Sequence, residues 1–429
     1  MEQLSEGLET GAMPTKLWNR DFSLVVIGQV ISIFGNMVLS FALPLYILDI
    51  SESPALFGLV LGLPYISLLV MSPIGGIMAD RLKKQRIMFW LDLTTTVIIV
   101  LYMATRGLFA SAVPIVIVKL MTLNAIQGMY MPAVQAAVPA LVPPDRLIPA
   151  NSAVTVVNML ANMVAPAVAG VLFGRFGLTP ILLISAVCFG ITAVMDLLIR
   201  IPFKKQSSPG SIAQMVIGDM SQSFRFIVKE KPILVKSAGI MFFVNLSLVS
   251  LLFVGLPVLI TQHLDMSMAM VGINQSVMMV GGLLGGITAG ALGTRLTMRK
   301  LYLPLLAISL FLLPMGLVFM FDAPNTMAYV TITAMGALIF VAAQMSSIPL
   351  IAFIQKETPT ELIGKVMSIM LILPFLASAL GILFFGMLFE RLAELPWVIV
   401  FAVVVVSAVI AVYTRRQFRG TEAASPTLL

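Results

Sequence analysis

The feature that most constrains this chain is its series of twelve long apolar stretches, separated by short polar breaks. A run of roughly 20 apolar residues is long enough to cross the hydrocarbon core of a bilayer as an α-helix. The composition agrees, because 59% of the 429 residues are hydrophobic and 10% are charged, whereas soluble domains carry about 25% charged residues. The sequence therefore predicts an all-α polytopic membrane protein with twelve transmembrane helices.

The predicted helices follow these apolar runs and end near Pro, Gly or charged residues. They cover residues 22–49, 54–79, 87–105, 111–140, 151–174, 179–199, 233–261, 269–293, 301–321, 327–354, 362–389 and 396–414. The first run is far longer than the core of a signal peptide, so we expect it to remain as the first span.

The distribution of Lys and Arg predicts the orientation. Of the 26 basic residues, 22 lie in the terminal segments and in alternate loops, 3 lie in the opposite loops, and Lys119 lies inside a span. Loops rich in Lys and Arg stay in the cytoplasm. We therefore expect a multi-pass protein of the cell membrane with cytoplasmic tails at 1–20 and 415–429 and a cytoplasmic linker at 201–232.

The linker divides the chain into two halves, 21–200 and 233–414, that resemble each other weakly. The segment Gly76–Leu82 aligns with Gly290–Leu296 at an offset of 214, and a second pair of loops repeats at an offset of 215. A near-constant offset of half the chain indicates a duplicated six-helix unit. We expect two pseudo-symmetric six-helix bundles with a substrate cavity between them.

Cysteine and histidine are nearly absent. Cys188 is the single cysteine and His263 the single histidine, so the chain can form neither an intramolecular disulfide nor a His-cluster metal site. We expect no metal, no cofactor and no catalytic residues. The net charge of +7 arises mainly in the loops, where it sets orientation and does not indicate a nucleic-acid partner. The sequence contains no Walker-type phosphate loop, so ATP is not expected to be the direct energy source.

The loop after the second predicted helix carries a motif, GIMADRLKKQR at 76–86. It resembles the loop 2–3 signature of the major facilitator superfamily, in which an Asp-Arg pair is followed by Gly and basic residues, although Lys83 stands where that Gly is usual. The resemblance implies a cytoplasmic gate, in which Gly76 permits close helix approach and Asp80 faces a helix N-terminus or a basic partner. The predicted gate residues are Gly76, Asp80, Arg81, Arg86, Asp92 and Arg295.

A narrower resemblance covers several loops and the first span. The segments PAVQAAVPALVPPDRL at 132–147, PTELIGKV at 359–366 and GQVISIFGN at 28–36 look like the branch that contains macrolide-efflux and enterobactin-exporter proteins. That branch often has an acid where Asn36 stands and an Arg where Thr95 stands. The resemblance implies proton coupling, but these neutral residues leave the coupling residue unidentified.

The fifth span contains an exporter-like kink. Its Ala165-Pro166-Ala-Val-Ala169-Gly170 resembles the Gly-Pro-x-x-Gly-Gly signature of exporters, with Ala in two of the Gly places. Pro166 is expected to kink the helix, and Gly170 to let a neighbouring helix approach.

Uncharged polar side chains inside the spans form the predicted substrate cavity. Amides in membrane helices often bond only to neighbouring helices, so packing remains the alternative for each of them. The resemblance implies that the first, fourth, seventh and tenth helices line the cavity, and two tyrosines add amphipathic surface. The predicted cavity residues are Gln29, Asn36, Tyr65, Asn124, Gln127, Tyr130, Asn245 and Gln344.

Ionisable residues within the spans are few, and each is costly at that depth. Lys119 either extends its amine to the interface or carries a charge in the cavity or outer gate. Asp92 is expected to pair with the Arg81–Arg86 cluster, with proton binding as the alternative. Asp196 and Arg200, spaced i, i+4, are expected to form an exposed pair.

These features predict a secondary active transporter, and the family resemblance implies a proton-coupled exporter of amphipathic small molecules such as drugs, macrolides or siderophore-like compounds. It would work by alternating access as a monomer in the lipid bilayer, with protons and a small-molecule substrate as partners. A lipid or lysolipid translocator, or a solute importer, is the alternative on the same fold. A membrane enzyme or a non-transporting receptor is disfavoured, because the sequence has neither clustered catalytic groups nor a sizeable signalling domain.

Overall fold

The computed structural model describes residues 18–105, 112–143, 146–201, 225–359 and 362–419. Its regular structure is helical throughout these ranges, and twelve helical spans are long and apolar enough to cross a membrane. The predicted all-α fold with twelve transmembrane helices is confirmed.

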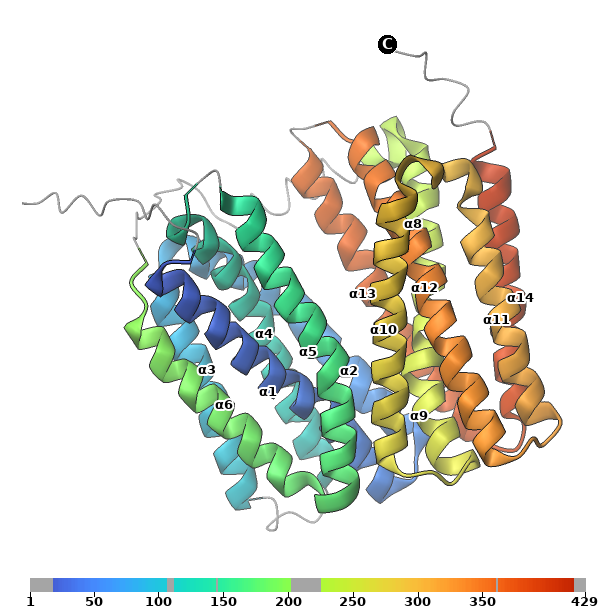
Figure 1. Ribbon diagram of the computed structural model, residues 1–429, viewed down its shortest axis with the longest axis horizontal. Helices are drawn as coiled ribbons and strands as arrows, with labels where there is room; N and C mark the ends of the chain where they lie inside the picture. The colour runs from blue at the N-terminus through green and yellow to red at the C-terminus, as the bar shows by residue number, and fades with distance from the viewer. Residues whose placement is uncertain (1–17, 106–111, 144–145, 202–224, 360–361, 420–429) are drawn as a thin grey trace, which may run out of the picture.

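The helices fall into two bundles of six spans (Figure 1). The N-terminal bundle contains α1 (Arg20–Ser51), α2 (Pro54–Arg81), α3 (Lys84–Thr105), α4 (Ala112–Leu141), α5 (Leu147–Phe176) and α6 (Leu178–Leu198). The C-terminal bundle contains a seventh span, Pro232–His263, followed by α10 (Met268–Leu292), α11 (Tyr302–Met320), α12 (Asn325–Glu357), α13 (Ile363–Arg391) and α14 (Pro396–Gln417). The predicted boundaries agree to within a few residues, whereas most of the predicted linker and of both tails lies outside the described residues.

Local sequence signals set several helix ends. The Asn19 side chain accepts the Phe22 N–H at 3.0 Å and caps α1. Ser53 caps α2 in the same way, with Pro54 at the first helical position. Gly177 separates α5 from α6 with φ of 70°, a conformation that costs other residues energy. These signals make the short connections between antiparallel spans.

The seventh span is irregular. It combines α8 (Pro232–Val244) and α9 (Leu256–Val258) with π-helical turns at Asn245–Val249, Leu251–Gly255 and Leu259–His263. Such turns are uncommon and occur frequently at functional sites. The backbone of this span therefore differs from that of its repeat counterpart, α1.

Glycines let the second and fourth helices of each bundle pack closely. A Cβ built on Gly75 of α2 would lie 2.5 Å from the Met129 Cα on α4. A Cβ on Gly281 of α10 would lie 2.3 Å from the Ala337 carbonyl oxygen on α12. The close approach expected at Gly76 occurs instead at Gly75, because a Cβ on Gly76 would meet no atom within 4 Å. The two bundles thus repeat the same packing solution.

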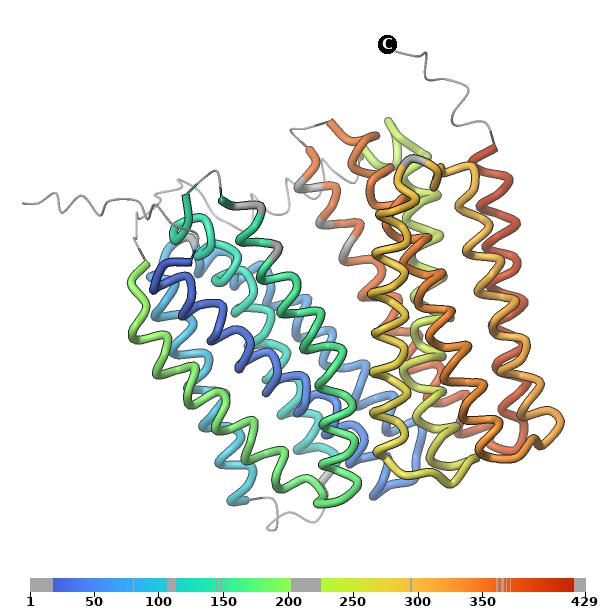
Figure 2. Tube along the Cα trace, in the orientation of Figure 1, coloured from blue at the N-terminus to red at the C-terminus, as the bar shows by residue number. Residues whose placement is uncertain are grey.

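The bundles contact each other near one end and diverge toward the other (Figure 1). The contacts between them are α5 against α10 and α2 against α13. The start of α1 and the end of α14 both lie at the diverging end (Figure 2). We call the opposite end, where α1 leads into α2, the contact end.

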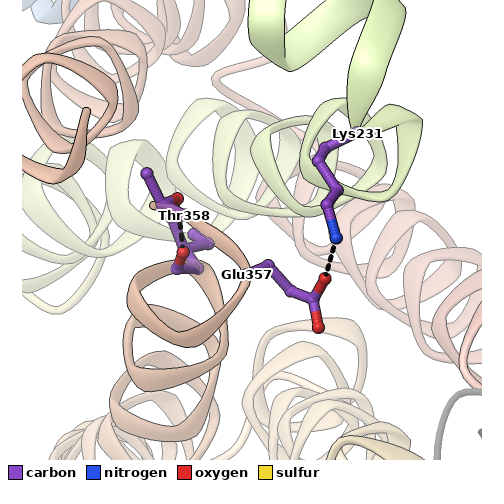
Figure 3. A network of polar contacts seen from close by, with 4 residues as sticks. Lys231, Glu357 and Thr358 are labelled. Atoms are coloured by element: carbon purple, nitrogen blue, oxygen red, sulfur yellow. Dashed lines mark hydrogen bonds and ion pairs between the residues drawn. The ribbon is translucent and has the colours of Figure 1, made fainter. Parts of the chain in front are cut away.

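The first and fourth spans of each bundle are tied together at the diverging end. The Asn19 amide donates to the Leu141 carbonyl oxygen over 2.7 Å, which joins the start of α1 to the end of α4. In the C-terminal bundle, Lys231 forms a 2.8 Å ion pair with Glu357 at the end of α12 (Figure 3). Because both charged side chains are partly exposed, this pair contributes at most about 1 kcal/mol, and its role is chiefly to fix position.

The glycine packing predicts a stability difference between two substitutions on α10. Gly281→Ala should lower the free energy of unfolding by about 1–3 kcal/mol, because its Cβ would overlap the α12 backbone. Gly286→Ala is the matched control, since a Cβ there would meet no atom within 4 Å. Thermal unfolding of both purified variants in detergent measures the effect, and equal melting temperatures would contradict the proposed close packing.

Candidate functional site

A polar cluster joins α1 and α4 inside the N-terminal bundle. The Asn36 amide donates to Gln127 Oε1 over 2.8 Å, and the Ser40 hydroxyl donates to Asn36 Oδ1 over 2.8 Å. Asn36 and Gln127 are half-buried and both belong to the predicted cavity set. In the described part of the chain, the Gln127 amide nitrogen has no protein partner, so it can donate to a ligand or to water.

A small cavity adjoins this pair. It is lined by Ser32 and Asn36 of α1, Asp92 and Thr95 of α3, Leu123, Ile126, Gln127 and Tyr130 of α4, and Phe189 of α6. Its volume of about 10 Å³ is close to the least that holds one water molecule. Asn36 and Thr95, the positions where the resembling branch carries an acid and an Arg, line this same cavity. Both are neutral here, and Asp92 supplies a carboxyl group beside them.

Asp92 lies in the core of the N-terminal bundle, away from the loop in which the gate motif lies. Its side chain is 1% exposed and interacts with the Thr192 hydroxyl of α6. Arg81 and Arg86 are exposed, and the described residues include no ion pair between either of them and Asp92. The structure therefore places Asp92 against α6 and not in the ion pair expected at the gate.

Asp196 of α6 is a second buried acid, and sequence reasoning missed it. The exposed pair with Arg200 is wrong, because Asp196 is 2% exposed and α6 ends at Leu198. The backbone N–H of Arg200 instead donates to Asp21 Oδ1 over 3.1 Å. A signal was present in the sequence, since Thr192 and Asp196 are one turn apart and put polar groups on one face of an otherwise apolar helix.

Gln29 and Tyr130, both predicted cavity residues, are buried, at 1% and 4% exposure. Tyr130 interacts electrostatically with Asp92 and Asp196, and its hydroxyl is hydrogen-bonded to Ser32. Neither side-chain amide atom of Gln29 has a hydrogen-bond partner among the described residues. An unsatisfied buried polar group costs about 1–3 kcal/mol, so Gln29 lowers the stability of the folded protein.

The remaining predicted amides bond mainly within their own bundle. Asn124 donates to a carbonyl of its own helix. Asn245 does the same and accepts the Ser378 hydroxyl at 3.3 Å. Gln344 accepts the Ser347 hydroxyl at 3.0 Å. All three are half-buried, and these bonds match the packing alternative stated for such amides.

The predicted kink in α5 lies at the contact between the bundles. A Cβ on Gly170 would lie 2.8 Å from the Met268 carbonyl oxygen, and one on Gly272 would lie 2.3 Å from the Pro166 carbonyl oxygen. Next to the proline, the Ala167 N–H donates to the Ser276 hydroxyl of α10 over 3.0 Å. Small residues and a backbone donor therefore bring α5 and α10 into close contact.

The second contact between the bundles joins α2 to α13. A Cβ on Gly58 would lie 3.1 Å from the Gly386 Cα. Tyr65 of the predicted cavity set also lies on this contact, with its ring centroid 6.2 Å from that of Phe375. The α2–α13 and α5–α10 contacts thus use the same device of glycines facing a neighbouring backbone.

Polar bonds close the contact end. Glu390, at the end of α13, accepts hydrogen bonds from the Ser53 hydroxyl and from the Ala55 N–H, the latter at 3.0 Å. A carboxylate at the start of α2 also interacts favourably with the helix dipole. The Gln262 amide donates to the Glu52 carbonyl oxygen over 2.9 Å and adds a second link between the bundles.

Lys119 is buried inside the N-terminal bundle. Its side chain is 4% exposed, so its amine does not extend to the surface. The Nζ atom lies 4.1 Å from the centroid of the Tyr102 ring, and it has no hydrogen-bond acceptor among the described residues. A cation–π contact with α3 therefore holds this charge.

The predicted gate motif lies at the diverging end. Arg81, Arg86 and Arg295 are exposed, and none forms an ion pair with a described acid. The side chain of Asp80 lies outside the described residues. The gate assignment therefore remains a prediction.

Comparison with known proteins identifies the family. Residues 25–382 match the Major Facilitator Superfamily. Macrolide efflux protein A of Streptococcus pyogenes is 21% identical over 388 residues, which cover 89% of this chain and 92% of that protein. An uncharacterized MFS-type transporter of Sinorhizobium fredii is 27% identical over 199 residues, which cover 46% of this chain and 49% of that protein.

Solved structures share the fold at low identity. The nucleoside transporter NupG superposes with a TM-score of 0.73 at 14% identity, covering 94% of this chain and 100% of that one. A bacterial homologue of the human lysosomal transporter Spinster superposes with a TM-score of 0.68 at 16% identity. That match covers 95% of this chain and 98% of that one.

Two packed six-helix bundles and these relatives define a multi-pass membrane transporter rather than an enzyme. The chain belongs to the major facilitator superfamily. Its resemblance to the macrolide-efflux branch is confirmed at low identity.

The contact end provides a test of its own. Glu390→Ala should weaken that contact by about 1 kcal/mol and raise the population of molecules in which the bundles separate there. Electron spin resonance distances between labels at Asp49→Cys and Ala393→Cys, in a Cys188→Ala background, measure this separation. Glu394→Ala, which removes a nearby exposed acid, should leave the distances unchanged, and identical distributions in both variants would contradict the role of Glu390.

Proposed function

We propose that this protein is a proton-coupled exporter of amphipathic small molecules, such as drugs, macrolides or siderophore-like compounds. The observation that carries the proposal is the similarity to macrolide efflux protein A, which extends over 92% of that protein's length. A match of this extent includes both bundles and their connection, so it concerns the whole transport unit and not one motif.

The geometry of the bundles supports alternating access. One end is held by the α5–α10 and α2–α13 contacts and by the bonds of Glu390, while the bundles diverge at the other end (Figure 1). Glycines on both sides of each contact bring the helix backbones close together, and such a contact between two halves suits one bundle rocking against the other.

The Lys and Arg distribution supports the orientation of this unit. The positive-inside rule supports cytoplasmic termini in a protein of the cell membrane, and in this orientation the diverging end faces the cytoplasm. An exporter must take its substrate from that side. Because the transport path lies between the two halves of a single chain, a monomer is sufficient for the cycle.

Inverted membrane vesicles from cells overproducing the chain test this function. An inward-acid proton gradient should drive accumulation of a fluorescent amphipathic dye, and a protonophore should abolish it. Reconstitution with a labelled lysolipid in place of the dye identifies lipid translocation as the competing function. Dye movement toward the cytoplasmic face under the same gradient would instead identify an importer and overturn the proposal.

The Asn36–Gln127 pair predicts a change in substrate preference. Asn36→Leu removes the 2.8 Å bond and leaves Gln127 Oε1 without its donor, so relative resistance to polar and apolar substrates should shift by about tenfold. A drug-susceptibility panel in overproducing cells measures it.

Asn158→Leu is the control for this panel, because that half-buried amide donates within its own helix. Equal loss of resistance to every compound in the Asn36→Leu strain, together with loss of protein from the membrane, would favour a packing role for Asn36.

A further inference from the structure

Two acids on neighbouring helices are buried inside the N-terminal bundle. Asp92 on α3 is 1% exposed and Asp196 on α6 is 2% exposed. The helices are in direct contact, with the Thr96 side chain 3.9 Å from the Cβ position of Gly190. The Asp92 carboxyl interacts with Thr192, one turn before Asp196, and with Asp196 itself. The two carboxyl groups therefore occupy one layer of the bundle.

Several buried polar atoms near the two acids have no hydrogen-bond partner among the described residues. Oδ2 of Asp92 and Oδ2 of Asp196 have no hydrogen-bond partner among the described residues, and neither has either amide atom of Gln29. Gln29 lies one turn before Ser32, whose hydroxyl is hydrogen-bonded to Tyr130, so the two α1 side chains lie on the same side of that helix. Native interiors rarely tolerate such groups without a functional reason.

The layer also lacks a compensating cation. From α1 it is faced by the neutral Gln29 and Ser32, and from α4 by Tyr130. Asp21, at the surface, accepts the Arg200 backbone N–H. In the described residues, neither buried acid forms an ion pair.

Basic groups elsewhere in the bundle are held away from this layer. The Lys119 amine, on α4, lies over the ring of Tyr102, on α3. Arg86 is exposed. Two like charges in an apolar core cannot both be retained without a counter-ion, so the pair must hold a positive ligand.

We propose that Asp92 and Asp196 form a carboxyl pair that holds one exchangeable proton, and that release and uptake of this proton couple the proton gradient to transport. The small cavity beside Asp92 fits this ligand, because its volume of about 10 Å³ is close to the least that holds one water molecule. The described residues include no group of three or more His, Cys, Asp or Glu side chains placed to hold a metal ion.

The cavity also gives the proton a route. It extends from Asp92 to Asn36 and Gln127, so one water can bridge the acid layer to the candidate substrate residues. On release, the carboxyl O–H bond breaks, the proton passes to water, and the electron pair remains on the carboxylate. Two adjacent carboxylates then repel each other and draw water, which favours a conformation that hydrates this layer. Re-protonation removes both effects and restores the dry packing.

This inference rests on the proposed function for its link to export, but the proton site itself does not. Infrared difference spectroscopy of the purified, full-length protein tests the site without any substrate. A protonated carboxyl C=O band should appear and titrate with pH, and Asp92→Asn and Asp196→Asn should each remove or shift it. Asp49→Asn, which changes an exposed acid of the same bundle, should leave it intact. No such band, or a band unaffected by both core variants, would overturn the proposal.

Transport in proteoliposomes tests the coupling. Both core variants should reduce gradient-driven dye accumulation by about tenfold or more, while dye exchange at equal pH remains measurable. This split distinguishes loss of coupling from misfolding, which would stop both. Core variants that retain full gradient-driven accumulation would contradict the coupling role. If the wild-type protein carries no dye but keeps the titrating band, the proposed function fails and the proton site stands.

Discussion

The inability of hydrocarbon to solvate polar groups governs this structure. It confines the backbone to helices, since no water is present in the bilayer core to satisfy free N–H and C=O groups. It also makes each ionisable side chain within a span a cost of about 2.5–3.5 kcal/mol at mid-helix. Asp92, Lys119 and Asp196 are therefore exceptions that packing alone does not explain. Lys119 has the Tyr102 ring to offset its charge, whereas the two acids have no comparable partner among the described residues.

The same solvent also shapes the contact between the bundles. Apolar side chains gain little by leaving lipid for protein, so close backbone approach and hydrogen bonds must provide the attraction. Gly58, Gly170 and Gly272 allow that approach, and Ser276 and Glu390 supply the bonds. A contact of this kind is specific but modest in energy. It can hold the bundles together at one end and still separate during a transport cycle.

The sequence predicted the features that depend on composition and periodicity, and it failed where three-dimensional neighbours decide. Span positions followed from apolar runs, and the exporter-like Pro166 from a local motif. The Asn36–Gln127 pairing was predicted only as shared cavity lining. Asp196 was misassigned because the i, i+4 spacing to Arg200 assumes a continuous helix. The helix α6 ends at Leu198, before Arg200. Gly76 was preferred to Gly75 for the analogous reason: adjacent glycines face different sides of a helix, and a motif does not reveal which side a neighbour occupies.

The two pseudo-symmetric bundles differ in where they keep buried charge. Among the described residues, the buried Asp and Lys side chains all lie in the N-terminal bundle, while the buried polar residues of the C-terminal bundle are Ser, Thr, Asn and Gln. A neutral bundle responds little to protonation, so the proposed proton-driven change would begin in the charged half. The ion pair of Lys231 with Glu357 and the close glycine contacts of α10 with α12 hold helices of the other half together. The two bundles therefore share one packing pattern, and the asymmetry of their buried charge is the basis of the proposed proton drive.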